Sequence, residues 1–539
     1  MLLVVATAIF CIVAGSLSCD PVAASFHPTN FHELQQLHQH QHQHEKNNDH
    51  DEYWRQRARI LQSEEKKMLG GDMSFERNER LANKLLMDAK TKEIDDGFRD
   101  PKQFLPAQSF LRAASSIRKS PVFQIIEDMP KGAVLHAHDT AIVSSEYVFW
   151  NITYRPNLYV CEIDGQLKFH FFAPGDAAHR PGCDWTLLQE MRKYDQHRTV
   201  DYRIAQQLTM VTRNAEQAYA NVDEAWSKFM SIFIFLGPML TYRPVFEDYF
   251  YQGLLEFYND NIIYLELRTV LPTLYDLDGK QYGPIEVARI YKQVADRFCR
   301  DYPDFVGVKL IYAPLRNVQE RQLEEFLSTA RELVRELPDF VAGFDLVGQE
   351  DKGVPLVEFA EQLRGLGNAS ATPVHLFFHA GETNWYGTST DENLLDAILL
   401  DTKRIGHGYA VLKHPELLEM IREKGIAIEV APISNQVLSL VKDMRNHPAA
   451  ALFAGDYPVV VSNDDPGLWG AQGLSYDFYE AFVGIMSRNA DLRALKKLAL
   501  NSINYSSMTQ DQKIRAMDIW RRRWDAFVAR LIESMINRK

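Results

Sequence analysis

From about residue 129 onward, short runs of β-branched and other apolar residues alternate with segments whose apolar residues recur every three or four positions. The short runs are typical of buried strands, and the segments between them have the periodicity of amphipathic helices. We expect eight strands, at residues 133–139, 262–269, 306–313, 341–348, 374–382, 404–410, 427–434 and 459–466. This alternation predicts an α/β fold, a TIM-type (β/α)8 barrel, over residues 129–515.

The first two expected strands are separated by about 120 residues, which is far too long for one loop. This stretch contains Cys161, Cys183 and the aromatic-rich, strand-like text LYVCEIDGQLKFHFFAP. We therefore expect a small domain at residues 150–205, inserted into the barrel after its first strand.

Strong helix-forming sequence precedes and follows the barrel. Residues 53–128 carry apolar residues at helical spacing, interrupted at Gly70-Gly71. A helical region of this kind cannot bury its apolar stripes alone, so it must pack on the main body or on a second copy of the chain. Residues 513–539 predict a C-terminal amphipathic helix whose apolar stripe packs on the core.

The N-terminus has two segments of unusual composition. Residues 1–18 contain the apolar run LLVVATAIFCIVAGSLS, which ends in small residues and is typical of a secretory signal peptide. The alternative is a membrane anchor, although the run is short for a span. Residues 19–52 are rich in His and Gln and predict a disordered linker, with loose metal binding as the alternative. We expect a secreted, extracellular protein without a membrane span.

The 539 residues include 59 Lys and Arg and 72 Asp and Glu, for a net charge of −13. This balance argues against a dedicated nucleic-acid-binding protein, but not against a nucleoside substrate. In an oxidising compartment Cys161 and Cys183, the closest pair among the cysteines after the N-terminal region, can form a disulfide. Secretion also makes glycosylation plausible at three Asn-x-Ser/Thr sequences, which begin at Asn151, Asn368 and Asn504.

Metal-ligating side chains lie at the ends of expected strands, where (β/α)8 barrels build their active sites. His136 and His138 are two residues apart, so both point to the same face of a strand. His379 and Asp464 lie at the ends of two other strands. Three His and one Asp suit a zinc ion that keeps an open position for water, and zinc converts this water into a hydroxide nucleophile.

Three further side chains suit the chemistry of such a centre. Glu382 follows His379 by three residues and can deliver or remove protons. His407, on another expected strand, can orient the hydroxide. The two adjacent aspartates can divide their roles, with Asp464 on the metal and Asp465 on the substrate.

The segments that carry these residues resemble those of the adenosine deaminase family, and in particular its secreted branch, the adenosine deaminase-related growth factors. They are MPKGAVLHAHD, FFHAGET, RIGHGYA, EVAPISNQVL and SNDDPGLWGAQGLSYDFYEAF, and the resemblance covers residues 60–535. It implies helical dimerisation through residues 53–128, hence a homodimer, and a disulfide-linked insertion after the first strand. A cell-surface receptor or a glycosaminoglycan is a possible partner of this insertion.

The resemblance also implies the roles of individual residues. It makes the three His and Asp464 ligands of one zinc ion, and it makes Glu382 the group that protonates purine N1. His407 would orient and polarise the hydroxide that attacks C6, and Asp465 would accept a hydrogen bond at purine N7.

Further residues would contact the base and the sugar. The resemblance implies a backbone contact from Gly348 to the base edge and places Asp139 and Trp226 near the sugar. Two positions differ from the family: Met230 stands where a Glu binds ribose hydroxyls, and Leu315 stands where a His contacts the sugar. We therefore expect intact deamination chemistry with weakened ribose recognition.

These features predict a secreted zinc-dependent deaminase. It would hydrolyse adenosine or 2′-deoxyadenosine to the corresponding inosine and ammonia, limit extracellular adenosine and so act as a growth factor. One alternative is a deaminase of another purine nucleoside, which Met230 and Leu315 leave open. Another is a secreted signalling or binding protein with little turnover, against which the complete metal and proton-transfer set argues. The signal peptide disfavours an AMP deaminase, which would be cytosolic.

Overall fold

The computed structural model describes residues 51–179, 181–367 and 373–536. The predicted signal peptide, nearly all of the His/Gln-rich linker and the sequence at Asn368 lie outside these ranges. The chain divides into two units, residues 1–63 and 64–539. A helix with exposed side chains occupies residues 51–67. Among the described residues, no helix combines the length and the apolar character that a membrane span requires.

Two parallel four-stranded sheets form the centre of the second unit. The first contains β1 (Gly132–His138), β5 (Ile262–Thr269), β8 (Gly307–Tyr312) and β9 (Val341–Phe344), in that order. The second contains β10 (His379–Ala380), β11 (Arg404–His407), β12 (Ala427–Val430) and β13 (Val459–Val461). Parallel bridges between Phe344 and Leu376 and between Ala137 and Asp464 link the sheets at both edges. The eight strands therefore form the closed ring of a barrel.

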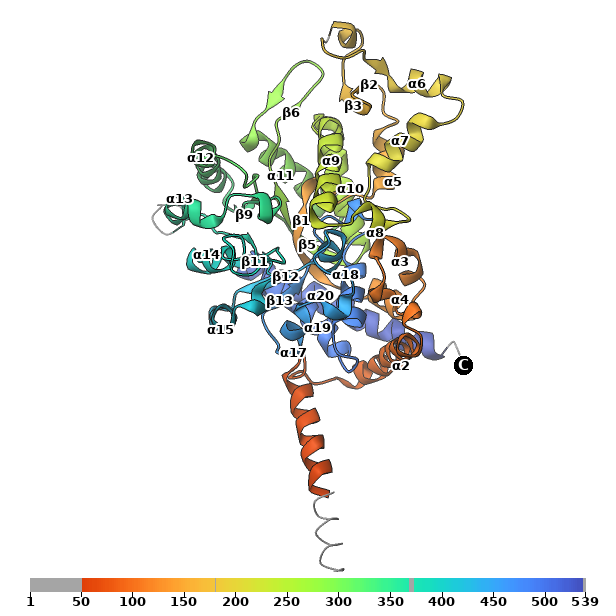
Figure 1. Cartoon of the computed structure of the whole chain (residues 1–539), viewed down its shortest axis with the longest axis vertical. Helices are drawn as coiled ribbons and strands as arrows, with labels where there is room; N and C mark the ends of the chain where they lie inside the picture. Colours follow the sequence, from red (N-terminus) through yellow and green to blue (C-terminus); the bar gives the residue numbers. More distant parts are fainter. Residues whose placement is uncertain (1–50, 180, 368–372, 537–539) are drawn as a thin grey trace, which may run out of the picture. The chain divides into compact units, whose positions relative to one another are not determined.

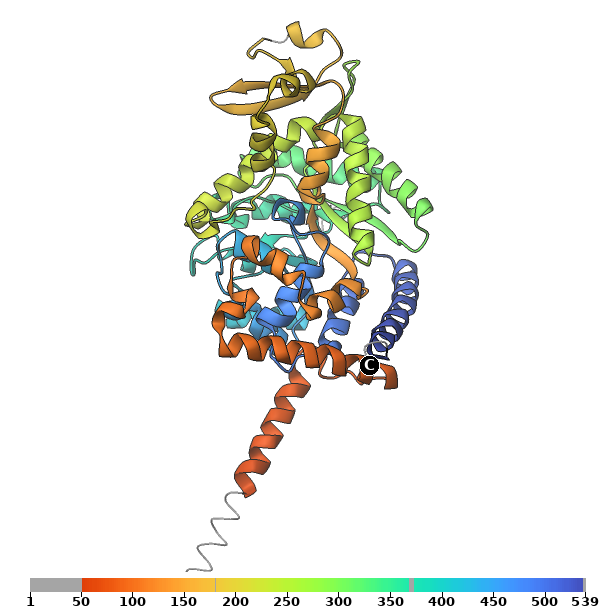
Figure 2. The ribbon, with the colours of Figure 1, turned by 90° about the vertical axis from the view of Figure 1, so that its right-hand side faces the viewer.

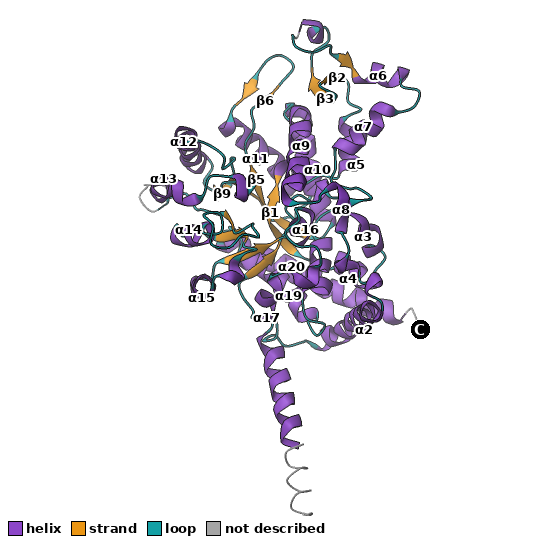
Figure 3. Ribbon diagram, viewed as in Figure 1, coloured by secondary structure: helices purple, strands orange, loops and turns teal. Residues whose placement is uncertain are grey.

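Helices surround this ring (Figure 3). They include α10 (Arg243–Asn259), α11 (Pro284–Asp301), α12 (Glu320–Glu336), α13 (Ala360–Leu366), α14 (Asn393–Leu399), α15 (Pro415–Lys424), α17 (Ala449–Ala454) and α19 (Leu492–Asn504). Each long helix is amphipathic: α12, for example, buries Leu323, Leu327, Ala330 and Leu333. These spacings of three and four residues turn one stripe of the helix toward the strands.

Several strands end earlier than the apolar pattern predicts. The expected strand at 427–434 ends at Val430, and helix α16 (Pro432–Val437) begins at Pro432. Proline lacks the N–H that a central strand needs and fits the first turn of a helix. The expected strand at 374–382 is reduced to the bridge at Leu376 and the two residues of β10.

The segment between β1 and β5 contains the small sheet that the strand-like text predicts. Strands β2 (Leu158–Ile163) and β3 (Gln166–Phe171) form an antiparallel hairpin, to which β4 (Thr186–Leu187) adds a third strand. Asp164 and Gly165 connect β2 to β3 with φ of 50° and 76°, the positive values that a type I′ turn requires. A disulfide joins Cys161 of β2 to Cys183.

Helices α5 (Ser145–Tyr147), α6 (Leu188–Tyr194), α7 (Thr199–Gln207), α8 (Ala215–Ala218) and α9 (Val222–Leu240) complete the segment between β1 and β5. In the views of Figures 1 and 2, the hairpin and α6 lie at one end of the unit, beyond the helices that surround the barrel. A short hairpin, β6 (Leu274–Tyr275) with β7 (Gln281–Tyr282), follows β5.

The flanking helices pack on the barrel unit itself. Helix α2 (Arg77–Arg99) packs against α4 (Pro121–Asp128), α19 and the C-terminal α20 (Gln510–Ile536), and α3 (Phe110–Ile117) packs against α16. The Glu79 carboxylate of α2 accepts hydrogen bonds from Trp524 of α20 (2.8 Å) and Lys496 of α19 (2.5 Å). The apolar stripe of α2 is therefore covered by this same chain, and the homodimer stays a prediction.

We predict that loss of the disulfide loosens the hairpin but not the barrel. The bond closes a loop of 22 residues. Closing a loop of this size contributes about 3 kcal/mol in the chain-entropy model, equivalent to roughly 100-fold in an opening equilibrium. In the double variant Cys161→Ser/Cys183→Ser, amides of β2 and β3 should exchange hydrogen faster by about this factor.

The matched control is Cys299→Ser, since Cys299 is a free, half-buried cysteine on α11. Equal hydrogen exchange at β2 and β3 in the double variant and the unmodified protein would contradict the prediction.

Candidate active site

Four side chains predicted as metal ligands converge at the C-terminal ends of β1, β10 and β13. His136, His138, His379 and Asp464 each offer one ligand atom, and these atoms all lie within 4.8 Å of one another. The Nε2 atoms of His136 and His138 are 3.4 Å apart. Asp464 Oδ1 lies 3.2 Å from the first and 3.1 Å from the second.

This geometry fits a metal ion better than a hydrogen-bonded cluster. Within the described ranges, the buried Oδ1 of Asp464 has no hydrogen-bond partner, although both imidazoles are so close. Zinc binds nitrogen and oxygen ligands at about 2.0–2.1 Å in tetrahedral geometry, which places neighbouring ligand atoms about 3.4 Å apart. The observed separations and the donor set of three imidazoles and one carboxylate therefore fit zinc.

The backbone holds Asp464 in an uncommon conformation. Its φ of 58° lies in the left-handed region, which non-glycine residues seldom adopt. Asp464 N–H donates to the carbonyl of His136 (3.2 Å), and the carbonyl of Asp464 accepts from His138 N–H (3.1 Å). These two bonds attach the end of β13 to β1 and bring three candidate ligands to one point.

Two buried carboxylates contact the Nδ1 atoms of His136 and His379. His136 Nδ1 lies 2.7 Å from Glu429 Oε2, and His379 Nδ1 lies 2.7 Å from Asp345 Oδ2. A neutral imidazole that donates from Nδ1 keeps its lone pair on Nε2, which can then face a metal. The carboxylates therefore orient both rings for metal binding.

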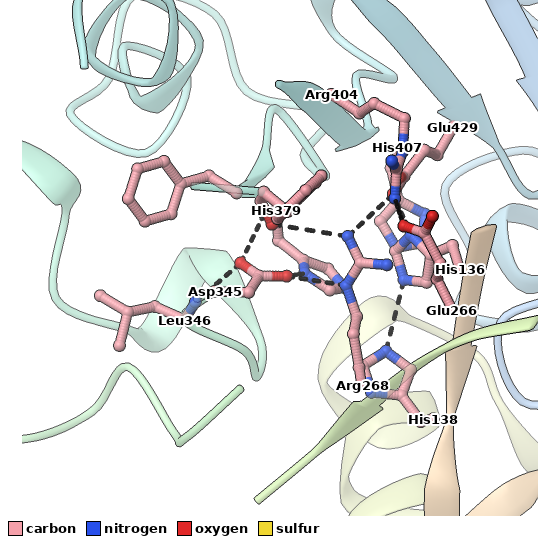
Figure 4. A network of polar contacts seen from close by, with 12 residues as sticks. His136, His138, Glu266, Arg268, Asp345, Leu346, His379, Arg404, His407 and Glu429 are labelled. Carbon is pink, nitrogen blue, oxygen red and sulfur yellow. Dashed lines mark hydrogen bonds and ion pairs between the residues drawn. The ribbon is translucent and has the colours of Figure 1, made fainter. Parts of the chain in front are cut away.

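Two arginines connect and neutralise these carboxylates (Figure 4). Arg268 donates to Asp345 and to Glu429, both at 2.8 Å. Arg404 donates to Glu429 and to Glu266, both at 2.6 Å. Burial opposes ionisation, but Arg268 and Arg404 hold the pKa of Glu429 well below its usual range. Burial is likewise outweighed at Asp345, where His379 and Arg268 lower the pKa.

Five charged residues of this network were not among those predicted from the sequence: Glu266, Arg268, Asp345, Arg404 and Glu429. Their signal is a charge inside or at the end of an otherwise apolar strand, as in IIYLELRT and AIEV. Charged side chains are almost never fully buried unless they are paired. Such positions therefore indicate partners inside the barrel, although the sequence does not show which ones.

Glu382 and His407 lie beside the candidate ligands. His407 Nε2 is 3.6 Å from Glu382 Oε1 and 3.8 Å from Asp464 Oδ2. In the part of the chain that the structure describes, Glu382 Oε1 is buried without a hydrogen-bond partner. The backbone N–H groups of Gly381 and Glu382 donate to Glu350 at 3.2 and 2.9 Å, which holds this loop in place.

The surroundings shift the pKa values of Glu382 and His407 in opposite directions. Burial, together with the charges of Asp464 and Glu350, raises the pKa of Glu382 well above its usual range. Burial lowers the pKa of His407 well below its usual range, and the neighbouring imidazoles act in the same direction. These shifts favour the protonated form of the Glu382 carboxyl and the neutral form of the His407 imidazole.

A cavity of about 360 Å³ opens at this centre, and its size falls within the range of small-molecule sites. It is lined by the four residues predicted to bind substrate, Asp139, Trp226, Gly348 and Asp465, and also by Met230 and Leu315.

Polar atoms in this cavity differ in how they are engaged. Asp139 accepts a hydrogen bond from Tyr291 (2.7 Å). Asp465 Oδ1 is buried, and no group among the described residues bonds to it. Burial and the charge of Asp464 raise the pKa of Asp465 well above its usual range.

Of the predicted glycosylation sites, Asn151 and Asn504 are exposed.

The described geometry agrees with the comparison to known proteins. Residues 195–520 match the family model "Adenosine deaminase", and residues 7–126 match "Adenosine/AMP deaminase N-terminal". The chain is 44% identical to "Adenosine deaminase" of Aedes albopictus over 490 residues, 90% of each chain. It is 43% identical to "Adenosine deaminase 2" of Homo sapiens over 475 residues, 88% of this chain and 93% of the relative.

Solved structures share the fold at lower sequence identity. A zinc-bound amidohydrolase from Burkholderia ambifaria is 17% identical and superimposes with a TM-score of 0.53, covering 76% of this chain and 94% of its own. Adenine deaminase from Arthrobacter aurescens, also 17% identical, gives 0.51, with 73% and 98% covered. The family models and the identity to relatives confirm the resemblance seen in the sequence: this chain belongs to the adenosine deaminase family, in the branch of adenosine deaminase 2.

Proposed function

We propose that this chain is a secreted, zinc-dependent adenosine deaminase that converts adenosine or 2′-deoxyadenosine to the corresponding inosine and ammonia. The observation that carries this proposal is the convergence of one metal-ligand set with the Glu382 carboxyl and the His407 imidazole at a cavity. The relatives named adenosine deaminase, which match about nine tenths of the chain, support it.

The chain's own residues divide the chemistry among them. His136, His138, His379 and Asp464 would hold zinc, which lowers the pKa of a bound water and so supplies a hydroxide at neutral pH.

Beside this centre, protonated Glu382 donates to purine N1, which makes C6 more electrophilic. His407 orients the attacking oxygen. Purine N7 carries a lone pair and no proton, so Asp465 donates the hydrogen bond there instead of accepting it as the sequence resemblance implied. The backbone of Gly348 contacts the base edge, and Asp139 and Trp226 lie near the sugar. Water adds its oxygen to C6, and one of its protons replaces the proton that Glu382 gave to N1. The other proton passes to the amino group, which leaves as ammonia when the bond from C6 to the amino nitrogen breaks.

Further parts of the proposal concern the protein outside the site. Secretion is supported by the signal-like residues 1–18 and by the Cys161–Cys183 disulfide, since disulfides persist in oxidising compartments. The proposal includes a growth-factor role, a homodimer through residues 53–128, and a receptor or glycosaminoglycan bound at residues 150–205. Asn151 and Asn504, both exposed, would carry glycans.

The direct test is an assay of the purified, secreted protein with adenosine, 2′-deoxyadenosine and AMP, which follows the loss of adenine absorbance. Deamination of either nucleoside supports the proposal. Preference for AMP would indicate a nucleotide deaminase, and turnover of none would favour a signalling or binding protein.

We predict that His379→Ala abolishes activity through loss of the metal. The variant removes one of four ligands, and zinc chelation should have the same effect. Metal analysis of the purified variant should show less than one zinc per chain. His375→Ala is the control, because His375 lies in the same segment with an exposed side chain. Full activity of His379→Ala without zinc would contradict the site.

We predict that Glu382→Gln slows turnover while zinc stays bound. Glutamine keeps the size and polarity of the side chain but cannot donate a proton to N1, so kcat should fall by about 10²–10⁴-fold. The control is Glu358→Gln, at an exposed position of the same barrel. A wild-type kcat in Glu382→Gln would remove Glu382 from the role of acid.

We predict that the unmodified protein distinguishes adenosine poorly from 2′-deoxyadenosine and has a high KM for adenosine. Met230 and Leu315 line the cavity and cannot replace the hydrogen bonds of a Glu and a His. An unsatisfied ribose hydroxyl costs about 1–3 kcal/mol, roughly 5- to 150-fold in affinity. Met230→Glu should therefore lower KM for adenosine more than for the 2′-deoxy compound.

Ser231→Glu provides the matched control, because it adds the same charge at the neighbouring, exposed position. A low-micromolar KM and strong ribose preference in the unmodified protein would refute the prediction.

A further inference from the structure

A series of hydrogen bonds leads from the Nδ1 side of the His407 imidazole into the interior, away from the candidate metal site. Asn435 Nδ2, on α16, lies 3.2 Å from His407 Nδ1. Asn435 Oδ1 lies 2.9 Å from His447 Nε2, and His447 Nδ1 accepts the backbone N–H of Ala449 at 3.1 Å. All three side chains are buried, with exposed fractions between 0% and 3%.

The backbone N–H of Ala449, at the end of this series of hydrogen bonds, determines which atom donates and which accepts in each bond. Ala449 is the first residue of α17, so its N–H has no acceptor within the helix and can only donate. His447 Nδ1 must therefore accept, and the proton of the neutral ring lies on Nε2. Burial lowers the pKa of His447 to about 3, in agreement with a neutral ring.

The protonation of His447 then determines the orientation of the Asn435 amide, and this amide determines the tautomer of His407. The N–H of His447 requires the oxygen of the Asn435 amide, which turns the NH₂ group toward His407. His407 Nδ1 accepts from this group, so the proton of the neutral ring lies on Nε2. This nitrogen faces Glu382 and Asp464, at 3.6 and 3.8 Å.

We propose that Asn435 and His447 are positioning residues that hold His407 as the tautomer protonated on Nε2, with that N–H directed at the oxygen attacking C6. This inference rests on the proposed deamination. The backbone adds a second constraint, because His407 has a φ of 60° and the following Gly408 has 53°. The wrong tautomer would present a lone pair to the attacking oxygen instead of an N–H.

The first test compares isosteric and conservative variants in the zinc-loaded protein. Asn435→Asp keeps the shape but removes the NH₂ donor, so His407 Nδ1 becomes the protonated nitrogen. We expect kcat to fall by about 10²-fold or more, as for other catalytic histidines in a wrong tautomer. KM and zinc content should stay close to those of the unmodified protein.

His447 offers a rescue series. The variant His447→Leu removes the donor to Asn435, so the Asn435 amide can rotate by 180°. It should lower kcat with little change in KM. Glutamine in His447→Gln can still donate to the Asn435 oxygen and should restore most of kcat. Asn446→Asp is the control for Asn435→Asp, because it makes the same change at an exposed position next to His447. A purely structural role predicts equal losses in His447→Leu and His447→Gln, and that result would overturn the proposal.

The second test is independent of turnover. In protein labelled with ¹⁵N-histidine, the ring nitrogens of His407, identified by their absence in His407→Gln, report which nitrogen carries the proton. We expect a protonated Nε2 in the unmodified protein and a protonated Nδ1 in Asn435→Asp. A protonated Nδ1 in the unmodified, zinc-loaded protein would overturn the proposal even if the variants fail to fold. If no nucleoside is deaminated, the proposed function fails, while the NMR result still decides the tautomer.

Discussion

The buried ion pairs of Arg268 are the interaction on which both the barrel and its centre depend. A single guanidinium, fully buried on β5, reaches Asp345 beyond β9 and Glu429 on β12. Each of these carboxylates would be costly to bury alone, and each also orients one histidine of the candidate metal site. One network of buried charges therefore both links distant strands and orients the histidines of the candidate metal site.

Similar side chains acquire different pKa values from the charges and polar groups that surround them. Glu429 lies between two guanidinium groups and stays ionised, whereas Glu382, close to other carboxylates, has a raised pKa. The same contrast separates adjacent residues, because the pKa of Asp464 is lowered beside the imidazoles and that of Asp465 is raised. A fold that separates the pKa values of like groups can assign one to structure or metal binding and the other to proton transfer.

The backbone departs from regular strand geometry where the chemistry is proposed. His407 and Asp464 both have positive φ, and strands β10 and β13 are only two and three residues long. Regular strands would direct alternate side chains to opposite faces, whereas these abrupt ends turn successive polar groups toward one point. The hydrogen bonds from β1 to Asp464 and from Asn435 to His407 hold these conformations in place.

The sequence alone determined the alternation of strands and helices and the four candidate ligands, because each is encoded in local periodicity or in a short motif. The resemblance to a known family singled out Met230 and Leu315. The tertiary structure alone decided which partners the buried charges choose, where strands stop, and that α2 packs on α20 of the same chain. The chain from Ala449 through His447 and Asn435 to His407 likewise joins three separate segments. Local patterns show that a polar residue faces the interior, but its partner depends on the register of segments far apart in sequence.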